Sequence, residues 1–281
     1  MPVPRSTGFP DADAQDAFLR MRRRQVLLRL AHRLRREPDD VNLILPFEEV
    51  TSALGIIGER DLGIQTIRVD SIVGTIDRAR DFDRQFRPTS SRGRERWQRI
   101  AAAQYRGEPL PPISVYRVGD LHFVRDGHHR VSVAHAAKLK LIDAYVIEVR
   151  TRLPARGIRF RSDLVIKDYE RLFSERVPLG RDIREKLQVS DPWSWAVLSE
   201  TVEAWGFRLM QQEQQFMDRS AVALRWYEDE YRPVVTMLRA AHMIDDYSEV
   251  EAYLRVAGQR YRLIRSHEWS EQIVEQVRSA R

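Results

Sequence analysis

The stretch Leu121-His122-Phe123-Val124-Arg125-Asp126-Gly127-His128-His129-Arg130-Val131-Ser132-Val133-Ala134 carries the clearest structural signal in the chain. Its first five residues have the composition of a β-strand, and Asp126-Gly127 is typical of a tight turn. The following residues predict a helix from about His128 to Lys138. The segment is therefore expected to form a strand, a turn and the start of a helix.

The start of a helix exposes unpaired backbone N–H groups and the positive end of the helix dipole, and both attract phosphate. Gly127 tolerates a positive φ and allows a ligand close to the backbone. His128, His129 and Arg130 add donors, although cations at this end of a helix oppose the dipole unless an anion binds there. This conflict predicts an anion site. The alternative is that Asp126 caps the helix and the histidines are solvated.

The flanking sequence predicts a mixed α+β region. Ile113–Val118 and Leu121–Arg125 form a hairpin around Gly119-Asp120, and further strands are predicted over 65–69 and 142–149. Helices are predicted over 15–36, 46–54 and 94–106, with Phe18, Met21, Leu27, Leu30, Ala31 and Leu34 as one apolar stripe on the first.

After Arg150 the pattern becomes helical. Helices are predicted over 162–176, 181–188, 192–216, 219–242, 247–265 and 270–280, and Pro233 is expected to kink the fourth. The chain then divides into a basic helix and helical lead-in over 1–60, a mixed α/β domain over 61–150 and an all-α domain over 151–281.

Residues from about 65 to 150 resemble the ParB/sulfiredoxin-like domain family. The resemblance rests on Ile67-Arg68-Val69-Asp70-Ser71-Ile72-Val73-Gly74, on Pro111-Pro112-Ile113-Ser114-Val115 and on Asp126-Gly127-His128-His129-Arg130. It implies that the last turn cradles the phosphates of ATP or CTP, with Gly127, His128, His129 and Arg130 as contacts. Mg²⁺ would accompany the nucleotide, with Asp77 or Asp126 as oxygen ligands.

The chain departs from this family in two ways. His128 stands where sulfiredoxins carry their cysteine, so the sulfinic-acid repair reaction is not expected. The Glu-Arg-Arg of the partition proteins is absent too, which puts a CTP-gated DNA clamp in doubt. A related branch phosphorylates free serine, and for such a phosphotransferase Asp126 and His129 are the candidate catalytic residues. Asp77 and Glu108 are alternatives to Asp126 as the carboxylate base. Whether the protein is an enzyme therefore stays open.

Several arginines outside the turn are further candidates. Arg78 is proposed as a second phosphate contact, with a solvated loop charge as the alternative. DNA contacts are proposed at Arg22, Arg23, Arg24, Arg94 and Arg96, because phosphate neutralisation supplies most nonspecific affinity for DNA. The alternative for these side chains is an ordinary solvated face, and for the first helix also a membrane-surface element.

Composition narrows the function classes. The 281 residues include 47 basic and 41 acidic side chains but no cysteine, which excludes disulfide, zinc-ribbon, iron–sulfur and thiol chemistry. The whole net charge of +6 lies in residues 1–150, where a phosphate-bearing ligand is expected to bind.

No structural metal and no membrane association are expected, and without an apolar signal core the chain is expected to be cytoplasmic. Three functions stay open: a regulatory nucleotide-binding protein, a DNA-binding regulator of the partition type, and a small-molecule phosphotransferase. The helical C-terminal region is a candidate homodimer interface.

Overall fold

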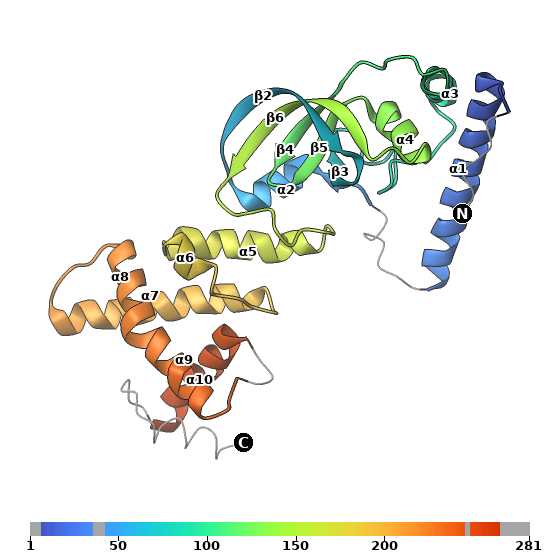
Figure 1. Ribbon diagram of the computed structural model, residues 1–281. Coiled ribbons are helices and arrows are strands. Elements are labelled where there is room, and N and C mark those ends of the chain that lie inside the picture. Colours follow the sequence, from blue (N-terminus) through green and yellow to red (C-terminus); the bar gives the residue numbers. More distant parts are fainter. Residues whose placement is uncertain (1–6, 36–42, 245–247, 265–281) are drawn as a thin grey trace. The chain divides into compact units, whose positions relative to one another are not determined.

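The chain forms two compact units that divide between Leu164 and Val165 (Figure 1). The computed structural model describes residues 7–35, 43–244 and 248–264. The first unit combines a mixed β-sheet with helices and the second is helical, so the chain is α+β. The first unit therefore includes the segment before residue 61 and continues past Arg150, beyond both boundaries drawn from the sequence.

The sheet of the first unit has six strands in the order β1-β3-β5-β4-β6-β2. Its strands are β1 (Leu45–Pro46), β2 (Ile56–Arg68), β3 (Ile72–Thr75), β4 (Ile113–Val118), β5 (Leu121–Asp126) and β6 (Leu141–Thr151). β4 and β5 form the predicted antiparallel hairpin, whereas β3 pairs with β5 and β4 with β6 in parallel. This mixed pairing places the end of β3 beside the end of β5, just before the Asp126-Gly127 turn.

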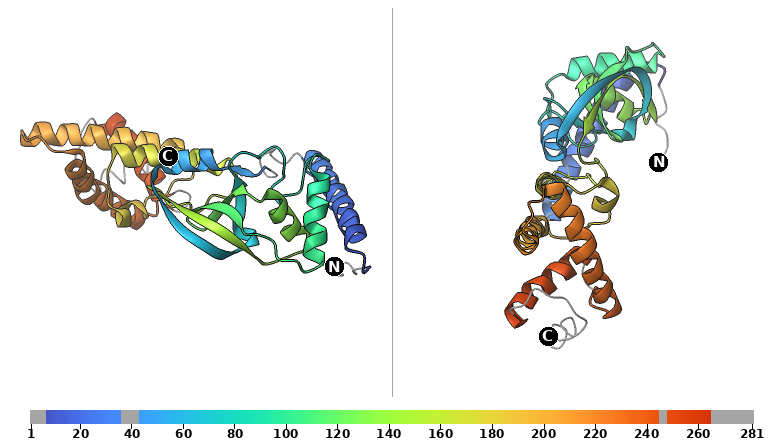
Figure 2. Two further views of the ribbon diagram at one scale, coloured as in Figure 1. Left: turned by 90° about the horizontal axis from the view of Figure 1, so that it is seen from above. Right: turned by 90° about the vertical axis from the view of Figure 1, so that its left-hand side faces the viewer.

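The helices of this unit are α1 (Pro10–Leu34), α2 (Phe47–Leu54), α3 (Arg94–Tyr105) and α4 (His128–Ala136), with a 3₁₀ turn at Val69–Ser71. α1 lies alongside α3, as the left-hand view in Figure 2 shows. The sequence predicted all four helices, and α2, α3 and α4 begin within one residue of the predicted position.

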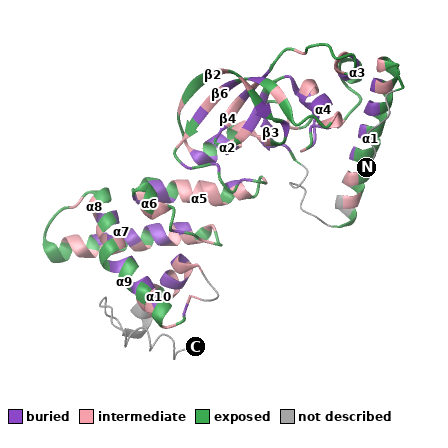
Figure 3. Cartoon of the chain, viewed as in Figure 1, coloured by how far each residue is buried: buried purple, intermediate pink, exposed green. Residues whose placement is uncertain are grey.

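The residues at the centre of the sheet are buried (Figure 3). Alternation along β4 sends Ile113 and Val115 into one hydrophobic cluster and Val118 into another. A third cluster joins α1 to α3 through Phe18 and Trp97, whose ring centroids are 5.5 Å apart. Together these clusters hold β5 and the start of α4 in a fixed position.

β1 and β3 lie where the sequence predicted no strand, and β2 and α1 differ from their predictions as well. β2 begins at Ile56, whereas the sequence predicted a strand only from residue 65. The first part of β2 was not predicted because β-bulges interrupt its pairing with β6 and break the alternation that marks a strand in sequence. The apolar residues of α1 lie on two faces: Phe18 and Met21 are buried, whereas Leu27, Leu30 and Leu34 are exposed. The single apolar stripe predicted for this helix is therefore wrong.

The remaining helices are α5 (Asp163–Arg176), α6 (Arg181–Arg184), α7 (Trp193–Glu213), α8 (Arg219–Arg225), α9 (Arg232–Ala240) and α10 (Glu249–Ile264), with a π-helical turn, η3, at Trp226–Tyr231. One hydrophobic cluster around Trp226, Tyr253 and Leu198 forms their core. The helix predicted over 270–280 lies outside the described residues. Within the described part of the chain, no helix has the length and apolar character needed to cross a membrane.

Candidate phosphate-binding site

The turn between β5 and α4 has a conformation that requires glycine. Gly127 is the N-cap of α4 with a φ of +101°, and a Cβ at this position would lie 2.6 Å from Cγ2 of Ile113. No side chain caps the helix, so Asp126 does not play the capping role considered as the alternative. The first turn of α4 therefore keeps its positive dipole end without a side-chain carboxylate cap.

Arg130 and Asp126 bind each other and the backbone before β4. The Nη1 group of Arg130 donates to the carbonyl oxygens of Pro111 and Pro112, both at 2.6 Å, and Nη2 donates to Oδ2 of Asp126 at 2.8 Å. The Arg130 side chain is only 13% exposed. In this arrangement Arg130 positions the turn, and Asp126 serves as its ion-pair partner.

His128 is buried beneath the turn. Its Nε2 lies 2.7 Å from Oγ1 of Thr75, and its ring stacks on Phe82 with a centroid distance of 5.7 Å. Burial lowers the pKa of His128 to about 4. A neutral, buried imidazole is a poor phosphate contact, so His128 connects the end of β3 to α4 and is not solvated.

His129 and Arg78, both predicted as phosphate contacts, lie together. They line a pocket of about 70 Å³, which is large enough for one phosphate group but not for a nucleoside. The other lining residues come from the loop between β3 and α3: Asp81, Phe82, Pro88, Ser90, Arg92 and Gly93. The base and sugar of a nucleotide would lie outside this pocket.

The His129 ring lacks a partner at one nitrogen. Among the described residues, nothing hydrogen-bonds its buried Nδ1. Burial lowers the pKa of His129, and the positive charges of Arg96 and Arg78 lower it further. An anion in the pocket would oppose that effect and accept a hydrogen bond from the ring.

A second helix begins at the same pocket. Gly93 is the N-cap of α3 with a φ of +79°, again without a side-chain cap, and a Cβ there would lie 2.9 Å from Nε2 of His129. The first turns of α3 and α4 therefore both lie close to His129. Two uncapped helix starts with two arginines form a positive environment that suits a phosphate oxygen.

The loop between β3 and α3 is held firmly. Phe82 and Phe86 are buried, and Nε of Arg87 donates to Oδ2 of Asp83 at 2.8 Å in an almost fully buried ion pair. Nη1 of Arg22 on α1 donates to the carbonyl oxygen of Pro88 at 2.7 Å. These contacts fix the backbone that carries Arg78 and Arg92.

The arginines proposed for DNA contact have different surroundings. Arg22 is engaged with Pro88, and the guanidinium of Arg94 lies 5.8 Å from the centre of the Phe18 ring. Arg23, Arg24 and Arg96 are exposed. Two of the five candidates therefore stabilise contacts within the chain.

Sequence reasoning overlooked Thr75, Phe82 and Ser90. Thr75 could have been found in the sequence, because it follows a Gly at the end of a strand. Phe82 and Ser90 reach the site only through the path of the loop, which the sequence does not show.

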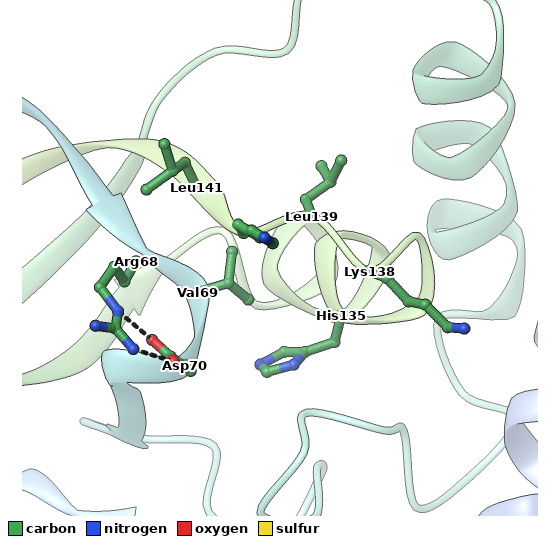
Figure 4. A pocket seen from close by; sticks show the side chains of 8 residues that line it. Arg68, Val69, Asp70, His135, Lys138, Leu139 and Leu141 are labelled. Carbon is green, nitrogen blue, oxygen red and sulfur yellow. Dashed lines mark hydrogen bonds and ion pairs between the residues drawn. The ribbon is translucent and has the colours of Figure 1, made fainter. Parts of the chain in front are cut away.

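The sequence also did not predict a second pocket, of about 550 Å³, near the other end of α4 (Figure 4). That pocket combines the Arg68–Asp70 ion pair, His135, Lys138 and Lys140 with Val69, Leu139 and Leu141.

No group of three or more His, Asp or Glu side chains gathers as a metal site in the described ranges. Comparison of the chain with protein families, with curated proteins and with solved structures finds no match.

Proposed function

We propose that the first unit binds a nucleotide, ATP or CTP with or without Mg²⁺, and that one phosphate occupies the pocket lined by Arg78, Arg92 and His129. The observation that carries this proposal is the meeting of two uncapped helix starts with these three side chains. The resemblance of residues 65–150 to the ParB/sulfiredoxin-like family supports the same turn as the phosphate cradle. A regulatory role is favoured over phosphotransfer, because Asp126, the candidate base, does not line this pocket.

Phosphotransfer has less support at this site. Asp126, the carboxylate proposed as a base, pairs with Arg130 and does not line the pocket. The carboxylate that does line it is Asp81. A base must lie within hydrogen-bond reach of the acceptor hydroxyl, so a serine-kinase-type reaction would depend on Asp81 rather than on Asp126.

Calorimetric titration of the full chain with ATP, CTP and GTP, with and without Mg²⁺, tests nucleotide binding. We expect saturable binding of at least one of them. Arg78→Gln and Arg92→Gln should each weaken it about tenfold or more, because a hydrogen bond to a charged group contributes about 1.5–3 kcal/mol. Arg99→Gln is the matched control, since Arg99 is exposed on α3 and does not line the pocket.

Absence of binding for all three nucleotides would refute the proposal. Equal affinity of the wild type, Arg78→Gln and Arg92→Gln would refute the pocket as the site. Arg130→Ala should weaken binding and also lower the melting temperature, since Arg130 holds the turn through Pro111 and Pro112.

Duplex DNA is the second candidate ligand, favoured by the exposed Arg23, Arg24 and Arg96. Retention of DNA should then fall steeply with salt, and the Arg23→Gln/Arg24→Gln variant should reduce the slope of log affinity against log salt by about two. A wild-type chain that does not retain DNA at low salt would exclude this function.

A further inference from the structure

A π-helical turn interrupts the long helical segment of the second unit. In this turn, η3, the N–H of Arg232 donates to the carbonyl of Tyr227, five residues earlier. Pro233 follows at once, and proline has no N–H and crowds the carbonyl four residues before it. The widened turn accommodates Pro233 without ending the helix, so the kink predicted there takes the form of a π turn.

The π turn brings two tyrosines to one place. The rings of Tyr227 and Tyr231 stack with a centroid distance of 5.7 Å and an interplanar angle of 24°. Both side chains line a cavity of about 630 Å³. π turns occur frequently at functional sites, and this volume falls within the range of small-molecule pockets.

Tyr231 has a buried hydroxyl without a partner. The residue is 3% exposed, and nothing in the described part of the chain hydrogen-bonds its Oη. Burial raises the pKa of Tyr231 well above its usual value, so the hydroxyl remains protonated and is a donor. Leaving such a donor unsatisfied destabilises the folded chain, and a ligand acceptor would relieve that cost.

The charged lining of the cavity is mainly positive. Lys186, Arg232 and Arg239 contribute cations, and Glu249 is the one acidic residue among the lining residues that the structure describes. Nε of Arg239 donates to Oε1 of Glu249 at 2.9 Å, so these two opposite charges pair with each other. Among the described residues, no carboxylate pairs with Lys186 or Arg232, so both can meet a negative group at the cavity.

The uncharged part of the lining is mixed: Gln188, Thr236 and Ser248 are polar, whereas Tyr227, Val235 and Ile244 are aromatic or aliphatic. Val235 and Ile244 contribute aliphatic surface beside the Tyr227 ring. Such a surface accommodates a flat apolar body, while the buried hydroxyl and the cations accept an anionic end.

We infer that this cavity binds a small organic anion, a carboxylate or phosphate carried on an aromatic ring. An anionic oxygen accepts hydrogen bonds from Oη of Tyr231 and from Arg232 or Lys186. The ring lies against Tyr227, Val235 and Ile244. This site belongs wholly to the second unit and is separate from the pocket at His129.

Ligand-observed NMR and thermal melting of the full chain test the inference with three probes: benzoate, phenyl phosphate and the uncharged benzyl alcohol. We expect saturable binding of at least one anionic probe and none of benzyl alcohol at the same concentration. Tyr231→Phe should weaken the anionic probe about tenfold. The same variant should melt at a higher temperature than the wild type without ligand, because the unsatisfied hydroxyl is gone.

Tyr253→Phe is the matched control, because Tyr253 is fully buried beside Trp226 but does not line the cavity. It should keep the wild-type affinity for the anionic probe. His129→Asn should keep it as well, which separates this site from the first unit. The inference is overturned if neither anion binds saturably, if benzyl alcohol binds equally well, or if Tyr231→Phe binds with wild-type affinity.

Discussion

Gly127 combines a φ of +101° with a close contact to Ile113, and both features exclude a side chain. The residues after it differ in what they do. His128 bonds to Thr75 and Arg130 to the carbonyls before β4, so these two hold the turn. His129 lines the pocket with Arg78. Among these three consecutive residues, two therefore support the turn and one lines the pocket.

Gly127→Ala is expected to reduce the free energy of unfolding by about 2–4 kcal/mol, since the strained φ and the contact with Ile113 add together. Urea denaturation measures this. Gly157→Ala is the control for φ alone, because Gly157 has a φ of +90° and a Cβ added there would meet no atom within 4 Å. Equal losses for the two variants would show that the Ile113 contact is unimportant.

His128 should make stability depend on pH. Its pKa is about 4 in the folded chain against 6.5 for the free side chain, so the unfolded state binds more protons between these values. The stabilisation is complete above pH 6.5 and is lost as the pH falls toward 4, at up to about 1.4 kcal/mol per pH unit. Urea denaturation at several pH values measures the slope.

His128→Asn removes this titrating group and should reduce that slope, and His122, whose pKa burial also lowers to about 4, should keep part of it. An NMR titration gives an independent measurement, because the His128 imidazole should stay neutral down to about pH 5. A midpoint near 6.5 for His128 would contradict its burial beneath the turn.

At the scale of elements, α1 joins the first unit by one face only. Ala14, Phe18 and Met21 pack with Trp97 of α3, whereas Leu30 is 51% exposed. The sequence pattern of α1 shows all of these residues as apolar and does not distinguish the buried ones from the exposed ones. The partner helix determines which of them are core.

Phe18→Ala is expected to lower the free energy of unfolding by about 3–5 kcal/mol, because it empties the space beside Trp97. Leu30→Ala should change it by no more than about 0.5 kcal/mol. Urea denaturation compares the two variants. A large loss for Leu30→Ala would mean that the exposed face of α1 is covered in solution.

At the scale of the molecule, none of the hydrophobic clusters formed by the described residues has buried members on both sides of Leu164. Every buried residue of the clusters around the sheet and α1 lies at or before Leu164, and the helical cluster begins at Phe173. Leu153, Ile158 and Leu164 belong to the core beneath the sheet. Residues 151–164 therefore complete the first unit rather than begin the second.

A fragment of residues 1–164 should fold by itself and keep the nucleotide affinity of the full chain. A fragment of residues 1–150 should be much less stable, because it lacks Leu153, Ile158 and Leu164. It also loses the ion pair between Arg161 and Glu49. Circular dichroism melts of the two fragments compare them, and equal melting temperatures would place the boundary at Arg150.

Local sequence determined the elements around the site. Asp126-Gly127 after a stretch with strand composition predicted the turn, and β4 occupies Ile113–Val118 as expected, because turn chemistry and strand propensity act over a few residues. Tertiary structure decided which side chains face the pocket. His128 and Arg130 are engaged by Thr75 and by Pro111 and Pro112, and His129 meets Arg78 through the path of an irregular loop. Those contacts join residues far apart in the chain, where no local pattern reports the direction of a side chain.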